Sequence, residues 1–288
     1  ILNLYLPCKS SHFFPFQPFF FFEKWKISCQ ILHGLDKNVF LCSMKKIRII
    51  FVIILFLLVI YSLWAWFQVG SRPDKIGLHR CNSLEKLEEK GGEYALIEVD
   101  VCIRENGRMD VTHDEDTTFG LDIAPYFAYL QQHDGNRMWM AVKNLDEENK
   151  EAFFLSLDSL CRTYDIAHER LIIESRRWDL MRLLTIHDFY TSYYVDAPKP
   201  SELTRFQTDS VITRLDRVAA SGCVRALSFP GWWYMTLRGQ YKDRDIEFLT
   251  WKHRSVQWEV FLHPVGKMML ADDRLKAILV KDKGRYHR

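Results

Sequence analysis

The chain has 288 residues, enough for one large domain or two of ordinary size. Its 39 basic residues nearly balance its 37 acidic ones, which argues against a protein that binds nucleic acid through a basic surface. A hydrophobic content of 48% fits a globular core plus a further apolar segment.

The first part of the chain does not resemble a protein core. Residues 1–43 begin with Ile and contain the aromatic run FFPFQPFFFF. Met44 is followed by KKIRII, which is typical of the start of a membrane-anchored protein. We therefore expect residues 1–43 to be translated upstream sequence or a disordered tail. The alternative is a second segment that lies at the membrane interface.

The apolar segment is residues 49–66, IIFVIILFLLVIYSLWAW, eighteen residues without a charge. Such a helix comes close to crossing a hydrocarbon layer of roughly 30 Å. Lys45, Lys46 and Arg48 precede it, and basic residues stay on the cytoplasmic side. We expect residues 44–70 to be a single-pass transmembrane anchor, with its amino end in the cytoplasm and residues 71–288 outside it, in the periplasm if the source is bacterial. A cleaved signal peptide is the rival interpretation, but the run is long for one and lacks a small-residue cleavage site.

From residue 75 onward, short apolar runs alternate with helical patterns. In the first predicted helix, NSLEKLEEKGG, Asn82 and Glu85 have the spacing of a capping box, and glycines follow. In a later one, Phe154, Leu157 and Leu160 lie at helical spacing. The predicted strands are KIGLH, YALIEVDVCI, a short RMDVTH, RMWMAVKNL, LIIES, YTSYYV, VRALSF, IEFLTW and RLKAILVKD.

This alternation predicts an α/β fold with a parallel sheet, because parallel strands need a crossover that is usually helical. About eight regularly spaced strands in residues 71–288 favour a (β/α)8 barrel of the TIM type, whose sites lie at the carboxyl ends of the strands. A doubly wound open sheet is the runner-up, but no GxGxxG fingerprint supports it.

Cysteines and tryptophans give weaker indications. The four cysteines after the apolar segment are far apart, without CxxC spacing, and we expect mostly free thiols. The late tryptophans suit either a substrate-binding lip or, as for most tryptophans, core packing. The residues concerned are Cys81, Cys102, Cys161, Cys223, Trp232, Trp233, Trp251 and Trp258.

The strongest chemical signal is the pair Glu98 and Asp100. Because one residue separates them, both carboxylates face the same side of a strand. Two buried acids are costly unless they are paired or bind a cation, and carboxylate oxygens suit Mg²⁺ or Ca²⁺. The alternative is pairing with nearby arginine or lysine.

His79 and His113 each close an apolar run and suit acid–base chemistry near neutral pH. Arg80 and Lys143 supply positive charge at strand ends, where they can bind a phosphate or pair with the acids. In a barrel, these strand ends would bring the histidines and the acids together.

The order HR-x-N, then E-x-D, then HD, then a strand that ends in x-K resembles the glycerophosphodiester phosphodiesterase family and, more broadly, the phospholipase C-like phosphodiesterases. The resemblance covers residues 76–143. It implies a TIM barrel that cleaves a phosphodiester, with residues placed like His79 and His113 as acid and base. It implies also that Glu98 and Asp100 hold the divalent metal and that Arg80 and Lys143 contact the phosphate.

Two positions depart from this family pattern. Cys81 stands where the family usually has glycine, and a side chain at that tight turn is expected to crowd the phosphate. Ala141 stands where the family commonly has a third acidic metal ligand. Glu174, which closes the next strand, is a candidate substitute.

Three hypotheses follow. The first is a membrane-anchored enzyme that acts on a glycerophosphodiester or a phospholipid headgroup, with residues 49–66 in the membrane. The second is a catalytically weakened or inactive barrel that binds such headgroups or a protein partner, which Ala141 favours. The third, a structural membrane protein without a ligand, leaves the strand-end cluster unexplained.

Overall fold

The computed structural model describes residues 37–70, 73–252 and 255–282. The chain forms two compact units, Ile1–Tyr61 and Ser62–Arg288. Most of the predicted amino-terminal extension, residues 1–36, lies outside the described residues, and its nature stays a prediction.

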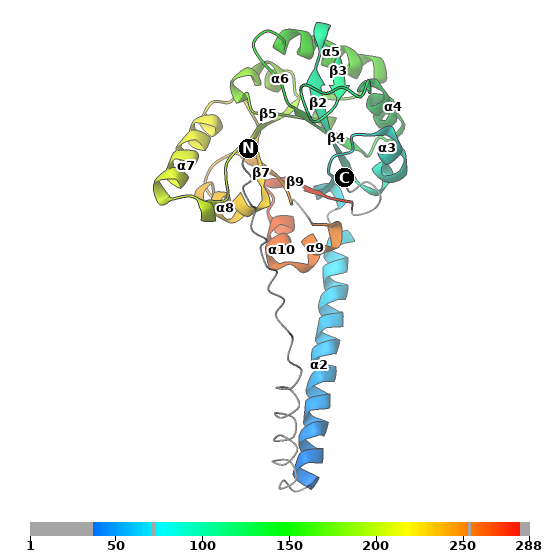
Figure 1. The fold of residues 1–288 in the computed structure, drawn as a ribbon, viewed down its shortest axis with the longest axis vertical. Coiled ribbons are helices and arrows are strands. Elements are labelled where there is room, and N and C mark those ends of the chain that lie inside the picture. Colours follow the sequence, from blue (N-terminus) through cyan, green and yellow to red (C-terminus); the bar gives the residue numbers. More distant parts are fainter. Residues whose placement is uncertain (1–36, 71–72, 253–254, 283–288) are drawn as a thin grey trace, which may run out of the picture. The chain divides into compact units, whose positions relative to one another are not determined.

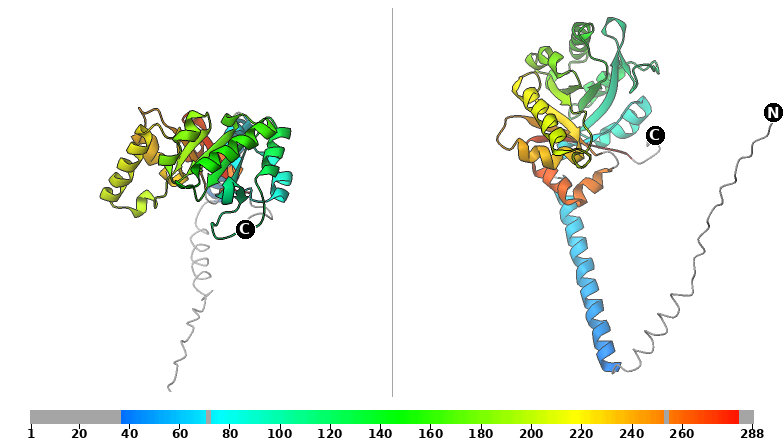
Figure 2. Two further views of the ribbon diagram at one scale, coloured as in Figure 1. Left: turned by 90° about the horizontal axis from the view of Figure 1, so that it is seen from above. Right: turned by 60° about the vertical axis from the view of Figure 1, so that its left-hand side comes forward.

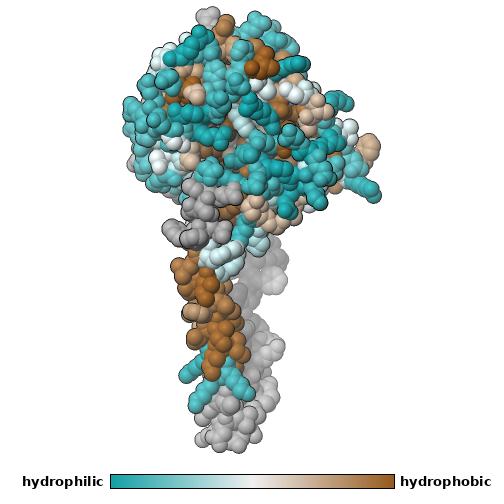
Figure 3. Space-filling view, turned by 180° about the vertical axis from the view of Figure 1, so that it is seen from behind, coloured by the Kyte–Doolittle hydropathy of each residue, from teal (hydrophilic) through white to brown (hydrophobic). Residues whose placement is uncertain are grey.

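Helix α2, Lys37–Gly70, begins in the first unit and ends in the second. Within it, Met44–Trp64 has a mean hydropathy of 2.7 and is long and apolar enough to cross a membrane. Its apolar side chains are exposed and form the continuous brown column in Figure 3. The predicted apolar helix is therefore present, while its insertion and orientation stay predictions.

The second unit is built on strands that close into a barrel (Figure 1). The sheet order is β1-β9-β8-β7-β6-β5-β4-β2-β3, and a further pairing of β1 with β2 closes the ring. All neighbours in the ring are parallel, as helical crossovers require. The predicted (β/α)8 barrel is confirmed and the open sheet is wrong. The strands are β1 Ile76–Leu78, β2 Leu96–Ile103, β3 Met109–Val111, β4 Arg137–Val142, β5 Leu171–Ser175, β6 Tyr190–Tyr194, β7 Ala226–Pro230, β8 Glu247–Trp251 and β9 Leu275–Val280.

Strand β3 is not part of the ring. It pairs antiparallel with the far end of β2, where Ile103 faces Met109 across the hairpin. Gly107 lies in the connection with φ +74, which favours glycine. Because β3 runs back toward the mouth of the barrel, the residues that follow Val111 return to the carboxyl ends of the strands.

Helices cover the outside of the ring, as α7 (yellow) illustrates in Figure 2. They are α3 Leu84–Lys90, α4 Ala124–Gln132, α5 Lys150–Tyr164, α6 Arg182–Ile186, α7 Arg205–Ala220, α8 Tyr234–Gln240, α9 Gln257–Leu262 and α10 Pro264–Ala271. Short 3-10 segments are η1 Pro73–Lys75, η2 Gly91–Glu93, η3 Glu105–Gly107, η4 His168–Arg170, η5 Trp178–Leu180, η6 Pro200–Glu202 and η7 Gly231–Trp233.

One sequence prediction about helices was wrong in detail. Ser83, not Asn82, caps α3 by accepting a hydrogen bond from the Lys86 N–H, because the oxygen and the nitrogen of the Asn82 amide both bind Asp100. The helical pattern of Phe154, Leu157 and Leu160 is confirmed in α5: Leu157 is buried, and Phe154 and Leu160 are partly buried and pack against the core. The buried positions of α5 are Phe153, Leu157 and Cys161.

The core has two parts. The larger lies between the strands and the helices, and the smaller fills the inside of the barrel. Alternating strand residues point inward, so that Leu96, Trp139 and Ile172 belong to the apolar cluster inside the barrel. Two residues further along each of these strands are Glu98, Ala141 and Glu174. The apolar interior therefore supports a charged layer at the carboxyl end.

Candidate active site

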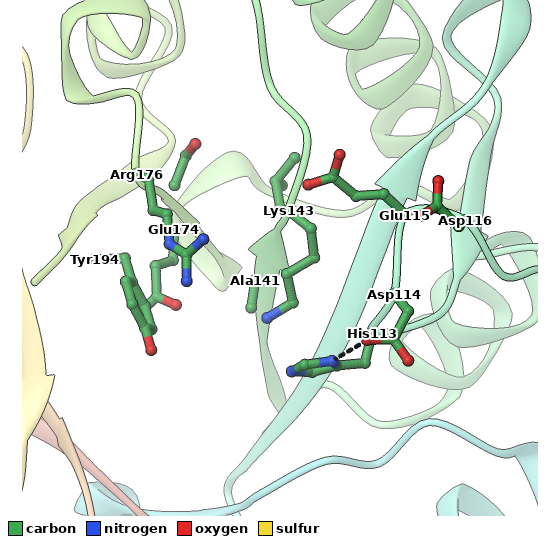
Figure 4. A pocket seen from close by; sticks show the side chains of 11 residues that line it. His113, Asp114, Glu115, Asp116, Ala141, Lys143, Glu174, Arg176 and Tyr194 are labelled. Carbon is green, nitrogen blue, oxygen red and sulfur yellow. Dashed lines mark hydrogen bonds and ion pairs between the residues drawn. The ribbon is translucent and has the colours of Figure 1, made fainter. Parts of the chain in front are cut away.

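A cavity of about 370 Å³ opens at the carboxyl ends of β4, β5 and β6. We call it the first cavity. In Figure 4, Lys143 projects into the space between Glu174 and Tyr194 on one side and His113 on the other. Ala141 lies below it, and by register Ala141 pairs with Asp100 of β2 and with Glu174 of β5.

His79 and Arg80 form a tight turn after β1. Arg80 has φ +54, which is unfavourable for a side-chain-bearing residue, and its backbone N–H donates to Glu98 Oε2 at 2.5 Å. The buried Lys86 ammonium donates to the carbonyls of His79 and Arg80, each at 2.8 Å. These hydrogen bonds hold a strained turn in place, and His79 Nε2 lies 3.8 Å from Glu98 Oε2.

His113 is held on both sides of its ring. Its Nδ1 lies 2.8 Å from Asp114 Oδ1, and its Nε2 lies 3.1 Å from Arg80 Nη2. Because a guanidinium can only donate, Nε2 accepts from Arg80 and Nδ1–H donates to Asp114. The neutral imidazole therefore presents its lone pair toward Arg80. Of the residues predicted to share one site, Arg80 contacts His113, and His79, one residue before Arg80, lies beside Glu98.

Asp100 lies at the centre of the charges. Its Oδ1 accepts from the Lys143 ammonium at 2.5 Å, and its Oδ2 accepts from the Asn82 amide at 2.7 Å. Burial alone would raise the pKa of Asp100, but the Lys143 charge together with the hydrogen bonds from Lys143 and Asn82 outweighs it and holds that pKa below its ordinary value. Burial would likewise lower the pKa of Lys143, and Asp100 and Glu98 raise it instead. The pair is therefore ionised.

The other two acids behave differently. Burial, and then the charge of Asp100, raise the pKa of Glu98 to about 8. Burial raises the pKa of Glu174 to about 7. Among the described residues, nothing donates a hydrogen bond to Glu174 Oε2. Glu98 and Glu174 are thus carboxyl groups that bind a proton readily near neutral pH.

The residues present do not fit the predicted divalent metal. Mg²⁺ and Ca²⁺ need several oxygen ligands, yet Asp100 already binds Lys143 and Asn82, and Glu98 Oε2 binds the Arg80 N–H. Ala141 offers no oxygen from its side chain. Among the residues that the structure describes, no group of three His, Cys, Asp or Glu is placed to hold a metal. The cation nearest the Asp100 carboxylate is the Lys143 ammonium.

Cys81 does not crowd the site, contrary to expectation. Its side chain is buried in the outer core, and its carbonyl accepts from the Tyr126 hydroxyl at 2.8 Å. The position therefore anchors the turn against α4 and leaves the first cavity open. All four cysteines in the described part of the barrel are free thiols, as predicted.

Three supporting residues were not predicted to belong to the site. Asn82 holds Asp100 through two hydrogen bonds, Lys86 holds the His79–Arg80 turn, and Asp114 orients His113. Asn82 belongs to the HR-x-N motif and Asp114 to the HD motif, so the family resemblance could have indicated that both residues belong to the site. The sequence could not indicate the role of Lys86, because its partners are backbone carbonyls, which every residue has.

No protein-family model matches the chain, and no curated protein matches its sequence. Among solved structures it is similar to a protein named as a glycerophosphoryl diester phosphodiesterase from Silicibacter pomeroyi DSS-3, with 15% identity and a TM-score of 0.51 over 71% of this chain and 88% of that one. A glycerophosphodiester phosphodiesterase from Parabacteroides distasonis gives 15% identity and a TM-score of 0.51 over 72% of this chain and 92% of that one. The resemblance predicted from the sequence is therefore confirmed at the level of the fold.

Proposed function

We propose that the barrel cleaves a phosphodiester, in a glycerophosphodiester or a phospholipid headgroup, with His113 as the base and His79 as the acid. The observation that supports this most is the contact of Arg80 with His113 beside the Lys143–Asp100 pair. His113 and Lys143 line the first cavity, whose size suits a small ligand. Arg80 reaches this cavity through its contact with His113, and His79 precedes Arg80 in the same turn.

Arg80 and Lys143 bind the phosphate. The Arg80 guanidinium offers parallel donors to two phosphate oxygens, and the Lys143 ammonium acts as a point charge. Both charges stabilise the phosphoryl oxygens as negative charge grows on them. This role follows from the position of Lys143, whose ammonium projects into the first cavity beside His113.

When the phosphate takes the Arg80 guanidinium, the lone pair of His113 Nε2 is released from its hydrogen bond to Arg80 and removes the proton from the attacking hydroxyl. The attacking oxygen forms a bond to phosphorus while the bond to the leaving oxygen breaks. That oxygen takes its proton from His79, whose Nε2 lies 3.8 Å from Glu98 Oε2. Where the attacking hydroxyl belongs to the substrate, the product is a cyclic phosphate that water then opens by the reverse proton transfers.

No step of this scheme passes through Mg²⁺ or Ca²⁺. Dependence on a divalent metal stays a prediction from the family resemblance, and the arrangement of Glu98 and Asp100 argues against it.

A second candidate is a barrel that binds phosphodiester headgroups or a partner protein but has little or no catalysis. The observation in its favour is Ala141, which separates Asp100 from Glu174 without adding an oxygen ligand. The intact contacts of His113 count against it, since binding alone does not need an oriented imidazole.

We also propose that α2 anchors the protein in a membrane, with the amino end in the cytoplasm and the barrel outside it. The length and hydropathy of Met44–Trp64 support the anchor, and Lys45, Lys46 and Arg48 at its amino end support the orientation. A protease added to intact cells or spheroplasts should digest the barrel. Full protection would contradict the orientation.

The activity is tested with the full chain in detergent, incubated with a panel of glycerophosphodiesters and lysophospholipids with and without EDTA. Phosphorus NMR follows the products and detects any cyclic phosphate. We expect cleavage that is lost in His79→Ala and His113→Ala while the thermal midpoint of both variants is kept. Folded wild-type protein that cleaves nothing in the panel would favour the binding protein instead.

A further inference from the structure

A second cavity, of about 610 Å³, lies at the same end of the barrel. Its walls come from the segments that follow β6 to β9, on the other side of the mouth from the first cavity. Three lysines and two tryptophans are among the residues that line it: Lys199, Lys252, Lys281, Trp232 and Trp251. The two tryptophans are among those that suit a substrate-binding lip, whereas the sequence around the three lysines predicts no role for them.

The fold brings these residues together from separate strands. Lys252 directly follows β8 and Lys281 directly follows β9. Backbone hydrogen bonds join the two exits, from the Lys252 N–H to the Leu279 carbonyl at 3.1 Å and from the Lys281 N–H to the Ser255 carbonyl at 2.9 Å. Lys252 and Lys281 therefore lie on two neighbouring segments that backbone hydrogen bonds hold together at the carboxyl end of the barrel.

The charge of this cavity lacks full compensation from the protein. Within residues 37–70, 73–252 and 255–282, neither Lys252 nor Lys281 forms an ion pair with a carboxylate within 4.0 Å, and Glu259 attracts Lys252 only from a greater distance. Lys252 is half-buried, and burial lowers the pKa of its ammonium. Lys199 is paired with Glu202 at 3.3 Å, but its ammonium also lies 5.5 Å from the centre of the Trp232 ring. A partly buried positive charge of this kind is stabilised by an anionic ligand.

The two cavities share a wall. Tyr194 lines the first cavity and Trp251 lines the second, and their rings stack with centroids 5.2 Å apart and planes 13° apart. A ligand that crosses the edge of this ring pair can place one group near His113 and Lys143 and another among the lysines. The rings offer flat apolar faces to the carbon atoms between those two groups.

We propose that the second cavity binds a further phosphate group, carried by the alcohol arm of the phosphodiester that the first cavity cleaves. A phosphate monoester carries about −1.5 to −2 charges at pH 7, which matches several ammonium groups better than a carboxylate does. Lysine binds phosphate as a point charge, whereas carboxylates are best matched by the planar fork of arginine. This inference rests on the proposed function, and it narrows the substrates to headgroups that bear an additional phosphate.

The test compares glycerophosphoinositol with glycerophosphoinositol 4-phosphate, which differ by one phosphate on the alcohol arm. Binding is measured by calorimetry on full-length His113→Ala protein, in which turnover does not interfere. We expect the phosphorylated ligand to bind at least about tenfold more tightly, the effect of one good charge-assisted contact. The double variant Lys252→Gln/Lys281→Gln should lose this preference. Lys242→Gln is the matched control, because Lys242 is exposed and precedes β8 at the opposite end of the barrel.

Two further arms make the outcomes distinct. Lys252→Arg/Lys281→Arg keeps the charge and should keep the preference, which separates loss of charge from loss of structure. Phosphatidylcholine vesicles that contain phosphatidylinositol or its 4-phosphate show whether the phosphate arrives on a lipid or on a soluble diester. Equal affinity for both ligands in both presentations would overturn the proposal, as would a preference that survives in the double glutamine variant.

Turnover by wild-type protein is measured separately with the same ligands. A preference without turnover would reject the proposed function and leave the second site standing. Turnover of both ligands without a binding preference for the phosphorylated one would support the proposed function and reject the second phosphate site.

Discussion

The Lys143 ammonium lies 2.5 Å from Asp100 Oδ1, where the family pattern led us to expect a divalent cation between acidic side chains. The Asp100 side chain is 2% exposed and that of Lys143 is 23% exposed, so the pair is shielded from water. A buried carboxylate needs a compensating charge, and here a strand-end lysine provides it. The negative charge of Asp100 is thus neutralised by the Lys143 ammonium of the same chain.

The first prediction follows from this pair. Lys143→Met should lower the free energy of unfolding by about 3–5 kcal/mol, because it leaves the Asp100 charge buried without its partner. Asp100→Asn combined with Lys143→Met should cost less than Lys143→Met alone. Urea denaturation of the three variants measures this. A double variant whose loss equals the sum of the two single losses would contradict the coupling.

The second prediction concerns Ala141. Since Ala141 pairs in register with both Asp100 and Glu174, Ala141→Glu should add the missing carboxylate between them and create a site for Ca²⁺ or Mg²⁺. At metal concentrations of about 100 times Kd, binding should stabilise this variant by about 2.7 kcal/mol. Thermal denaturation with and without each metal provides the measurement.

Ala141→Gln is the matched control, because it has the size of glutamate without the charge. If wild-type protein is itself stabilised by Ca²⁺ or Mg²⁺, and Asp100→Asn removes that effect, then the chain holds a metal and our interpretation of Lys143 is wrong.

Much of this site could be predicted because strand geometry is regular. The spacing of Glu98 and Asp100 fixed both on one face of a strand, and parallel strands end at one rim, so that His79 and Lys143 had to come near them. The aspartate–lysine pair was foreseen only as an alternative to a metal. The local sequence does not show whether the Asp100 carboxylate binds a divalent metal or the Lys143 ammonium.

Other features could not be predicted, because they depend on contacts between distant residues or on weak local patterns. Asn82 has the spacing of a helix cap, but Asp100, 18 positions away, takes its side chain. Lys86 reads as an exposed helical lysine, yet its ammonium binds two carbonyls of a turn that precedes the helix. Helices α9 and α10 were not predicted, because they have only six and eight residues and so give little periodic pattern.

A third prediction compares the contributions of His113 and Asp114 to kcat. His113→Ala should lower kcat by roughly 10² to 10⁴, the usual contribution of a positioned acid–base group. Asp114→Ala should lower kcat by about tenfold or less, since the Asp114 side chain is 73% exposed and exposed pairs contribute little. Steady-state kinetics on the substrate identified by the panel gives both values. An Asp114→Ala variant as impaired as His113→Ala would mean that Asp114 acts directly on the substrate.

The fourth prediction concerns the pH dependence of stability and follows from Glu174. Burial raises the pKa of its carboxyl from 4.5 in the unfolded chain to about 7 in the folded protein. Between these values the folded state binds more protons than the unfolded state, so stability falls as pH rises. The contribution is fully present below pH 4.5 and is lost by about pH 7, a change of about 3 kcal/mol.

Glu174→Gln removes this titration and keeps the shape of the side chain. Between pH 5 and pH 8 the variant should therefore lose less stability than wild-type protein, and at pH 8 it should be the more stable of the two. Glu98, whose pKa is raised to about 8 by burial, adds a decline of the same sign that the variant keeps. Urea midpoints at the two pH values test this. Parallel declines in both proteins would mean that the Glu174 carboxylate has a cationic partner, and a metal ion bound at Glu174 would then regain support.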